Sequence, residues 1–314
     1  MLTVLMATRN RAATLQQTLE SFCRLQEPSS GWKLVIVDNG STDQTPAVLA
    51  SFENRLPLHT VYEPTNGKNS ALNTGLDIVE GDLTVFTDDD VFPHADWLVE
   101  LRNAADAQLA YSMFGGAVVP RWEIPPPHWV QWVQQGPVYS LADLSLKEGP
   151  LSPFLVFGPN MAIRTSVFQS GTRFDSATGP SASHNYAMGS ETELTLRLDR
   201  EGHKAWFVPS AVVEHFIRDY QIRKAWVLKR AIRYGRGMFR LHNRTDNSEI
   251  ARSWFEMPIP LRLYVKLFKE AIKIAKARVR SDERGLFSAH WRLNYLWGYV
   301  IEARLSRLRR IRVI

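Results

Sequence analysis

The sequence has a single cysteine, Cys23, which excludes an intrachain disulfide framework and favours a reducing compartment. Cys23 falls within a predicted helix, residues 11–25, where we expect a buried structural thiol. No apolar run reaches the roughly 18 residues that a membrane-spanning helix needs. The chain also lacks internal repeats, low-complexity tracts and a signal-peptide pattern at its start. We therefore expect a globular protein that does not cross a membrane.

Positive and negative charges are unevenly distributed along the 314 residues. From residue 217 onward there are 24 Lys and Arg against 8 Asp and Glu, whereas the preceding residues carry 14 against 24. This asymmetry predicts an anionic partner for the basic region: lipid headgroups, nucleic acid or an acidic polymer. Because no recognised nucleic-acid-binding motif accompanies the charge, we expect no nucleic acid partner.

Strand and helix signals alternate over the first 115 residues. Four short apolar runs are each followed by a segment with helical spacing, in the pairs 2–7 and 11–25, 33–37 and 45–52, 58–62 and 70–79, and 83–87 and 94–109. This alternation predicts an α/β fold, a mostly parallel sheet with helices on both faces. The predicted domains are residues 1–216, with halves 1–115 and 116–216, and a basic amphipathic helical region, 217–314.

Polar residues follow three of these runs, at the strand ends where open α/β sheets bind ligands. The clusters are Thr8-Arg9-Asn10, Asp38-Asn39-Gly40-Ser41 and Asp88-Asp89-Asp90. Three adjacent carboxylates repel one another unless a cation or strong hydrogen-bond donors offset them. Carboxylates on a tight turn suit Mn²⁺ or Mg²⁺, which bind one or two protein carboxylates together with phosphate oxygens. The alternative interpretation is a solvated acidic turn at the start of a helix.

Six segments of the chain follow one another in an order that is similar to one known family. They are 4–11 (VLMATRNR), 37–43 (VDNGSTD), 66–75 (NGKNSALNTG), 88–90 (DDD), 157–164 (FGPNMAIR) and 189–194 (GSETEL). Together they resemble the large inverting glycosyltransferase family 2 over residues 2–215, about two-thirds of the chain. The resemblance implies a Rossmann-like GT-A fold, with 1–115 binding a nucleotide sugar and 116–216 facing the acceptor. It also implies metal-dependent transfer of a sugar from a nucleoside-diphosphate sugar to a hydroxyl of a lipid-linked, polysaccharide or other glycan acceptor.

The resemblance assigns four residues to the nucleotide. Asp38 would hydrogen-bond the nucleobase, with Thr8 and Arg9 beside it. Lys68 would lie near the nucleobase or the diphosphate; the alternative is a surface lysine at the start of a helix.

The resemblance also divides the aspartate cluster by role. Asp88 would approach the ribose, Asp90 would bind the divalent cation (Mn²⁺ or Mg²⁺), and Asp89 could do either. His215, expected at the end of the apolar run 206–213, resembles a histidine that helps hold the metal or the diphosphate. A histidine with a purely structural role is the alternative.

Inverting transfer needs a carboxylate to take the proton of the acceptor hydroxyl. We predict Glu191 as this base and Glu193 as the fallback, although either could instead cap the helix that follows. The family usually has Asp where this chain has Glu191, which leaves a nucleotide-sugar-binding protein without activity as an alternative function. A nucleotidyltransferase is less favoured because no Gly-rich phosphate loop with a lysine occurs near the N-terminus.

A predicted helix over residues 261–279 carries the clearest pattern of the basic region. Apolar residues recur at 261, 265, 268, 272, 275 and 279, beside basic residues at 262, 266, 269, 273, 276 and 280. Such a helix lies in a membrane interface with its cations toward anionic headgroups. The alternative is a helix packed on the catalytic body or on a second subunit. We expect a cytoplasmic protein, peripheral on the cytoplasmic face of the membrane.

Three tryptophans, Trp122, Trp129 and Trp132, surround a proline-rich loop. Their aromatic faces could stack on sugar rings, enter a bilayer edge or pack in the core.

Overall fold

A computed structural model describes residues 1–142, 145–181, 186–245 and 261–311 of the chain. The described residues form two compact units. Unit 1 comprises Met1–Glu123, Tyr139–Ala182 and Ser190–Ile217, and unit 2 comprises Ile124–Val138, Ser183–Gly189 and Arg218–Ile314. Residues 246–260 and 312–314 of the predicted basic region lie outside the described residues.

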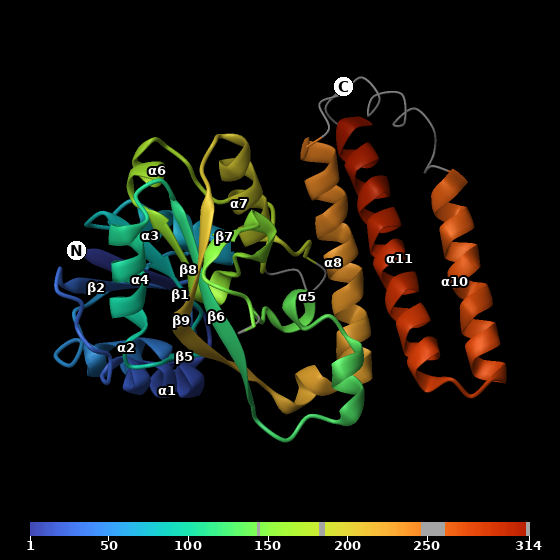
Figure 1. Cartoon of the computed structure of the whole chain (residues 1–314), viewed down its shortest axis with the longest axis horizontal. Helices are drawn as coiled ribbons and strands as arrows, with labels where there is room; N and C mark the ends of the chain where they lie inside the picture. The colour runs from blue at the N-terminus through green and yellow to red at the C-terminus, as the bar shows by residue number, and fades with distance from the viewer. Residues whose placement is uncertain (143–144, 182–185, 246–260, 312–314) are drawn as a thin grey trace. The chain divides into compact units, whose positions relative to one another are not determined.

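Unit 1 is built on one sheet with helices around it (Figure 1). Its strands follow the order β3-β2-β1-β4-β8-β6-β9-β5, with β7 paired to β9. The strands are β1 Leu2–Thr8, β2 Trp32–Asp38, β3 Leu58–Tyr62, β4 Leu83–Phe86, β5 Val91–Pro93, β6 Met113–Trp122, β7 Gly149–Leu151, β8 Met161–Arg164 and β9 Ala205–Ile217. β1 to β4 pair in parallel, whereas β8 runs antiparallel to β4 and to β6. The sheet therefore has a parallel first half and a mixed second half.

Helices flank this sheet, which confirms the predicted α/β class. The helices of unit 1 are α1 Ala12–Phe22, α2 Thr45–Phe52, α3 Lys68–Leu76, α4 Trp97–Ala107, α6 Ser166–Gln169 and α7 Ser190–Arg200, with the short turns η2 Pro153–Leu155 and η3 Gly158–Asn160. One core cluster joins Leu72 of α3 and Leu194 of α7 to Leu5 of β1. A Cβ on Gly75 would overlap the Leu5 side chain, so the glycine lets α3 approach β1 closely. α1 and α4 meet through Phe22 and Trp97, whose rings are 5.9 Å apart.

Asn160 holds the mixed half of the sheet at an irregularity between β6 and β9. The pairing shifts register between Gly116 and Ala117. Gly116 pairs with Val208, but Ala117 pairs with Val212. Asn160 is fully buried there, and its Nδ2 donates to the carbonyls of Ala117 and Ala211 at 2.9 and 2.8 Å. Its Oδ1 accepts from the Trp97 indole at 2.8 Å. One side chain thus pairs the polar groups that the bulge leaves inside the core.

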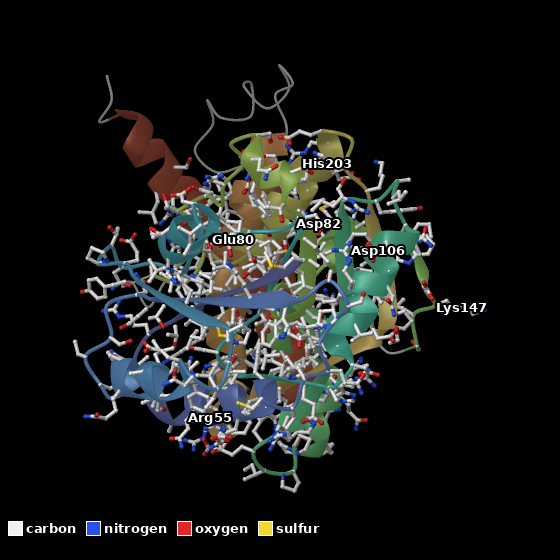
Figure 2. All side chains as sticks on the ribbon, turned by 90° about the vertical axis from the view of Figure 1, so that its left-hand side faces the viewer. Arg55, Glu80, Asp82, Asp106, Lys147 and His203 are labelled. Carbon is white, nitrogen blue, oxygen red and sulfur yellow. The ribbon has the colours of Figure 1, made fainter. Side chains whose placement is uncertain are left out.

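A buried arginine fixes the start of β4, the strand that leads into the aspartate cluster. Arg102 of α4 donates through Nη1 to Asp82 at 2.9 Å and through Nε to Asp106 at 3.1 Å. Figure 2 labels both acidic residues. Because Asp82 directly precedes β4, these bonds tie the strand to α4.

One prediction of local structure is confirmed with shorter bounds, and another is wrong. The helix predicted at residues 94–109 forms as α4, Trp97–Ala107, and the short strand β5 precedes it. β5 forms because Val91–Pro93 pairs with β9, a partner distant in sequence. Cys23 is exposed rather than buried, because α1 ends at Phe22 and the cysteine lies at its cap.

Unit 2 is helical in its described part. Its elements are η1 His128–Trp132, α5 Gln135–Tyr139, η4 Asp219–Ile222, α8 Lys224–Thr245, α10 Leu261–Val279 and α11 Glu283–Ile311. The helix α11 packs against both α8 and α10. Glu302 of α11 is buried and accepts from the Nε atoms of Arg236 and Arg240 at 2.8 and 2.7 Å, so the charges of these α8 residues are paired. None of the described helices is both long and apolar enough to cross a membrane.

The predicted tryptophan cluster packs within the units. In unit 2, Trp129 is buried and its ring lies 5.3 Å from that of Phe287, while Trp132 lies 6.3 Å from the same ring. In unit 1, Trp122 meets Tyr139 edge-on at 5.5 Å. Core packing, one of the three predicted roles, accounts for these contacts.

Candidate active site

The carboxyl ends of β1, β2 and β4 meet at one edge of the unit 1 sheet. Thr8 pairs with Asp38 at the last position of the β1–β2 ladder, and Leu5 of β1 pairs with Phe86 at the end of β4. Parallel strands that end in register present their following residues at the same edge. The predicted polar clusters therefore lie together, as the alternation of strands and helices indicated.

Asp89 turns back toward β1. Its Oδ2 accepts a hydrogen bond from Thr8 Oγ1 at 2.7 Å, and its carbonyl accepts from Thr18 Oγ1 at 3.1 Å. Burial, followed by the neighbouring Asp90 carboxylate, raises the pKa of Asp89 to about 6. Asp89 thus holds its negative charge less readily than an ordinary aspartate, and the Thr8 hydroxyl is directed at it.

Asp90 lies between a guanidinium and an imidazole. Its Oδ2 is 3.6 Å from Arg11 Nη1, and its Oδ1 is 3.5 Å from His215 Nε2. The β5–β9 pairing causes this proximity, because Val91 pairs with His215 and Phe216 N donates to the Asp90 carbonyl at 2.9 Å. The prediction that His215 follows the end of its strand is wrong, since β9 continues to Ile217.

His215 is oriented by a backbone carbonyl. Its Nδ1 lies 2.7 Å from the Tyr139 carbonyl oxygen, to which it donates, so Nε2 is the nitrogen that faces Asp90. Burial lowers the pKa of His215, but the Asp90 carboxylate outweighs burial and leaves the pKa above its ordinary value. A histidine held through Nδ1 presents Nε2 to a metal or to a carboxylate.

Lys68 joins the aspartate cluster to the predicted base. Its Nζ lies 2.6 Å from Asp88 Oδ1 and 3.0 Å from Glu191 Oε1. Burial opposes the charge of Lys68, but the two carboxylates raise its pKa above the ordinary value. Burial likewise raises the pKa of Glu191, but Lys68 outweighs it, so the pKa lies below its ordinary value. Glu191 is therefore a half-buried carboxylate that stays ionised chiefly because of Lys68.

The first turn of α7 determines that Glu191, and not Glu193, reaches Lys68. Ser190 Oγ donates to Glu191 Oε2 at 2.8 Å, and a Cβ on Gly158 would lie 2.8 Å from Glu191 Cγ and Oε1. Gly158 thus leaves the space that the Glu191 side chain occupies. Glu193, the predicted fallback, instead accepts from Arg197 one turn later at 3.1 Å.

The residues predicted to bind the nucleobase differ in burial and in their contacts. Asp38 is buried at the end of β2, and its Oδ1 accepts from Ser41 N at 3.0 Å in the turn that follows. Arg9 is exposed, and in the described part of the chain it makes no hydrogen bond or ion pair with the aspartates. The structure therefore gathers the predicted residues with the exception of Arg9 and Glu193.

Three residues of the group had no predicted role: Arg11, Gly158 and Ser190. Each belongs to a segment that resembled the family, so its position was visible in the sequence. Their contacts were not, because each contact joins residues that are far apart in the chain or depends on how one side chain turns.

The described residues contain no group of three or more His, Cys, Asp or Glu side chains placed to hold a metal. Asp90 and His215 do supply one carboxylate and one imidazole nitrogen close together. Mg²⁺ and Mn²⁺ sites in nucleotide-dependent enzymes commonly use one or two protein ligands and complete the set with phosphate oxygens and water. The residues therefore fit a divalent cation that a diphosphate would help to hold.

The sequence model of glycosyl transferase family 2 matches residues 3–171, more than half of the chain. The chain belongs to glycosyl transferase family 2. A probable glycosyltransferase of Bacillus subtilis, YdaM, is 25% identical over 248 residues, which cover 74% of this chain and 54% of YdaM. A beta-monoglucosyldiacylglycerol synthase of Nostoc sp. is 28% identical over 102 residues, covering 31% of this chain and 22% of the synthase. The chain thus spans about half or less of the length of these relatives.

A solved glycosyltransferase shares the fold. The mannosyltransferase PcManGT from Pyrobaculum calidifontis, in complex with GDP-Man and Mn²⁺, superposes with a TM-score of 0.62 at 20% identity, over 98% of this chain and 86% of its own. This likeness confirms the predicted GT-A fold. Together with the family match, it shows that the chain has the fold of a glycosyl transferase family 2 protein. The two predicted alternatives, an inactive binding protein and a nucleotidyltransferase, gain no support from these matches.

Proposed function

We propose that this glycosyltransferase inverts the anomeric carbon in a single displacement, with Glu191 as the general base. The observation that carries the proposal is the Lys68 bridge, which keeps Glu191 ionised and places it 3.0 Å from the same ammonium that contacts Asp88. In such a displacement the acceptor hydroxyl attacks from the face opposite the leaving nucleoside diphosphate, and a positioned carboxylate takes its proton. Glu191 combines ionisation, partial burial and a side chain held by Lys68 and Ser190, which suits that step.

The donor would bind along the strand ends. Asp38 is assigned to the nucleobase with Thr8 and Arg9 beside it, Asp88 and Asp89 to the ribose side, and Lys68 to the diphosphate. Support comes from the shared edge of β1, β2 and β4 and from the family resemblance of these segments. In this arrangement the bound diphosphate competes with Asp88 and Glu191 for the Lys68 ammonium.

Asp90 and His215 would hold the divalent cation, Mn²⁺ or Mg²⁺. When bound, such a cation offsets the negative charge that develops on the leaving diphosphate. The role of this chain's residues is to orient the ligands: the Tyr139 carbonyl fixes the His215 ring, and β5–β9 pairing sets its distance from Asp90. PcManGT, whose structure contains Mn²⁺ with GDP-Man, supports this assignment by its shared fold.

The acceptor is proposed to be lipid-linked or a polysaccharide, presented at the cytoplasmic face of a membrane where the enzyme is peripheral. Two observations support this proposal: the excess of 24 basic over 8 acidic residues from residue 217 onward, and a relative named for a glucosyldiacylglycerol product.

Turnover with a panel of nucleotide sugars tests the function. We expect release of nucleoside diphosphate with at least one donor in the presence of Mn²⁺, loss of release with a chelator, and a product of inverted anomeric configuration by NMR. Asp90→Ala should lower release by at least about 100-fold. Full turnover by Asp90→Ala would contradict the metal role, and a retained anomeric configuration would contradict single displacement.

A further inference from the structure

The helix α10 packs on α11 through one side only. Leu263, Glu270 and Ala277 are buried, while Leu267 and Ile274 are half-buried. Residues at this three- and four-residue spacing share one face of a helix. Figure 1 shows α11 beside α10 within unit 2, and the remaining side of α10 faces away from it.

That outward side of α10 is apolar and exposed. The exposed fractions are 42% for Tyr264, 45% for Val265, 67% for Phe268, 39% for Ile272 and 87% for Val279. Four of these residues belong to the apolar stripe that the sequence predicts; the side chain of Leu261 lies outside the described residues. Among the large apolar side chains exposed in the described part of the chain, five of twelve lie on this helix, so they form a patch rather than scattered positions.

A row of exposed cations runs along one edge of the apolar stripe. Its members are Lys266, Lys269, Lys273, Lys276 and Arg280. Because each residue turns the helix by about 100°, these positions share one side of α10, next to the apolar stripe. Glu270, the one acidic residue in the sequence of α10, lies on the α11 side, where its Oε1 accepts from Lys273 at 2.6 Å. The outward side therefore combines apolar groups with positive charge and no carboxylate.

We propose that this outward side of α10 lies in the interface of an anionic lipid bilayer, an inference that rests on the proposed function at a membrane-bound acceptor. A bilayer accommodates both groups, because the apolar side chains enter the acyl boundary while the cations meet anionic headgroups. A second copy of the chain fits less well. A two-fold contact through this face would set the same row of cations against itself.

Sedimentation of the full chain with lipid vesicles tests the proposal. We compare vesicles of phosphatidylcholine with vesicles that contain about one-third phosphatidylglycerol. The wild-type chain should sediment with the anionic vesicles at low salt, and high salt should weaken this binding because ions screen the lysines.

Two sets of variants separate the apolar and charged contributions. Phe268→Ser with Ile272→Ser should weaken binding by at least about tenfold, because two side chains no longer enter the acyl boundary. Replacing Lys266, Lys269 and Lys276 by Gln should weaken it about 100-fold, since each lysine near an anionic surface contributes about fivefold. Because these side chains are exposed, the melting temperature should remain that of the wild type.

Matched controls carry the same changes on unit 1. Leu109→Ser removes a leucine that is 78% exposed, and a triple variant replaces the half-buried Lys33 and the exposed Lys147 and Lys204 by Gln. Figure 2 labels Lys147. Both controls should bind anionic vesicles within about twofold of the wild type.

Three results would overturn the proposal: absence of wild-type binding to anionic vesicles, equal binding by the α10 variants and their controls, or a lipid-free dimer that Phe268→Ser dissociates. A separate measurement of nucleoside diphosphate release, in solution without vesicles, distinguishes failure of this inference from failure of the proposed function. Release that survives in the α10 variants while vesicle binding is lost supports the inference. A wild-type chain that binds vesicles through α10 but releases no nucleoside diphosphate also supports it, and contradicts the proposed function alone.

Discussion

Replacing Lys68 by methionine removes the ammonium between Asp88 and Glu191 and keeps an unbranched side chain. The two ion pairs measure 2.6 and 3.0 Å, and all three side chains are less than a quarter exposed. Hydrogen bonds to charged groups contribute about 1.5–3 kcal/mol each, and water replaces part of that here. We therefore expect Lys68→Met to lower the free energy of unfolding by about 2 kcal/mol at neutral pH.

The pH dependence of this loss follows from Glu191. In the wild type its pKa lies below the ordinary 4.5, so its stabilising contribution is present above pH 4.5 and is lost as pH falls through the lowered pKa. In Lys68→Met burial remains without the lysine, which raises the pKa of Glu191. The charged form then destabilises the fold, so the deficit should be largest at neutral and alkaline pH and should shrink in acid. Urea unfolding across this range measures it.

The same change should move the acidic limb of the kcat profile to higher pH, because the base is ionised only there. At neutral pH we expect kcat to fall about 10- to 100-fold, measured as nucleoside diphosphate release. Lys68→Arg, which keeps the positive charge, is the control and should keep the acidic limb near that of the wild type. An unmoved limb in Lys68→Met would refute the role of Lys68 in keeping Glu191 ionised.

Three further predictions concern the same unit. Gly158→Ala should lower kcat about tenfold or more with donor affinity unchanged, because its Cβ would displace Glu191; an unchanged kcat would argue against this contact. Asp89→Asn should raise the stability of the donor-free, metal-free chain by up to about 3 kcal/mol near pH 8, given a pKa of about 6 against the ordinary 3.8. Thermal melts should also show that the wild type loses stability as pH rises from about 4 to 6 and that this variant lacks the loss; equal slopes would contradict the raised pKa. Asn160→Leu should cost about 4 kcal/mol in urea unfolding, because it leaves two carbonyls and the Trp97 indole without their partner; a loss under about 1 kcal/mol would contradict that.

The first half of the fold was predictable because its signals are local. The runs that became β1, β2 and β4 are mostly apolar, and their parallel pairing places Thr8, Asp38 and the aspartates at one edge whatever follows in the chain. The six segments that resemble the family also predicted the GT-A fold and a role for each site residue. The individual roles of Asp88, Asp89, Asp90 and the other site residues stay predictions.

The second half depended on contacts between distant residues. The strand β5 exists only through its pairing with β9, so the residues after the aspartates read as a helix start. The Lys68–Glu191 contact joins residues 123 positions apart, which no local pattern reveals. For α10, periodicity showed an apolar stripe, but only the position of α11 shows that this stripe faces outward.

Glu191→Gln tests the central claim most directly, with sugar transfer and nucleotide affinity measured on the same preparation. Glutamine keeps the shape of the side chain but cannot accept the proton of the acceptor hydroxyl. We expect kcat to fall about 10³-fold while the dissociation constant of the nucleoside diphosphate changes by less than about threefold, and Glu193→Gln, the matched control, to retain transfer within about tenfold. Transfer at the wild-type rate by Glu191→Gln would contradict the assignment of Glu191 as the base.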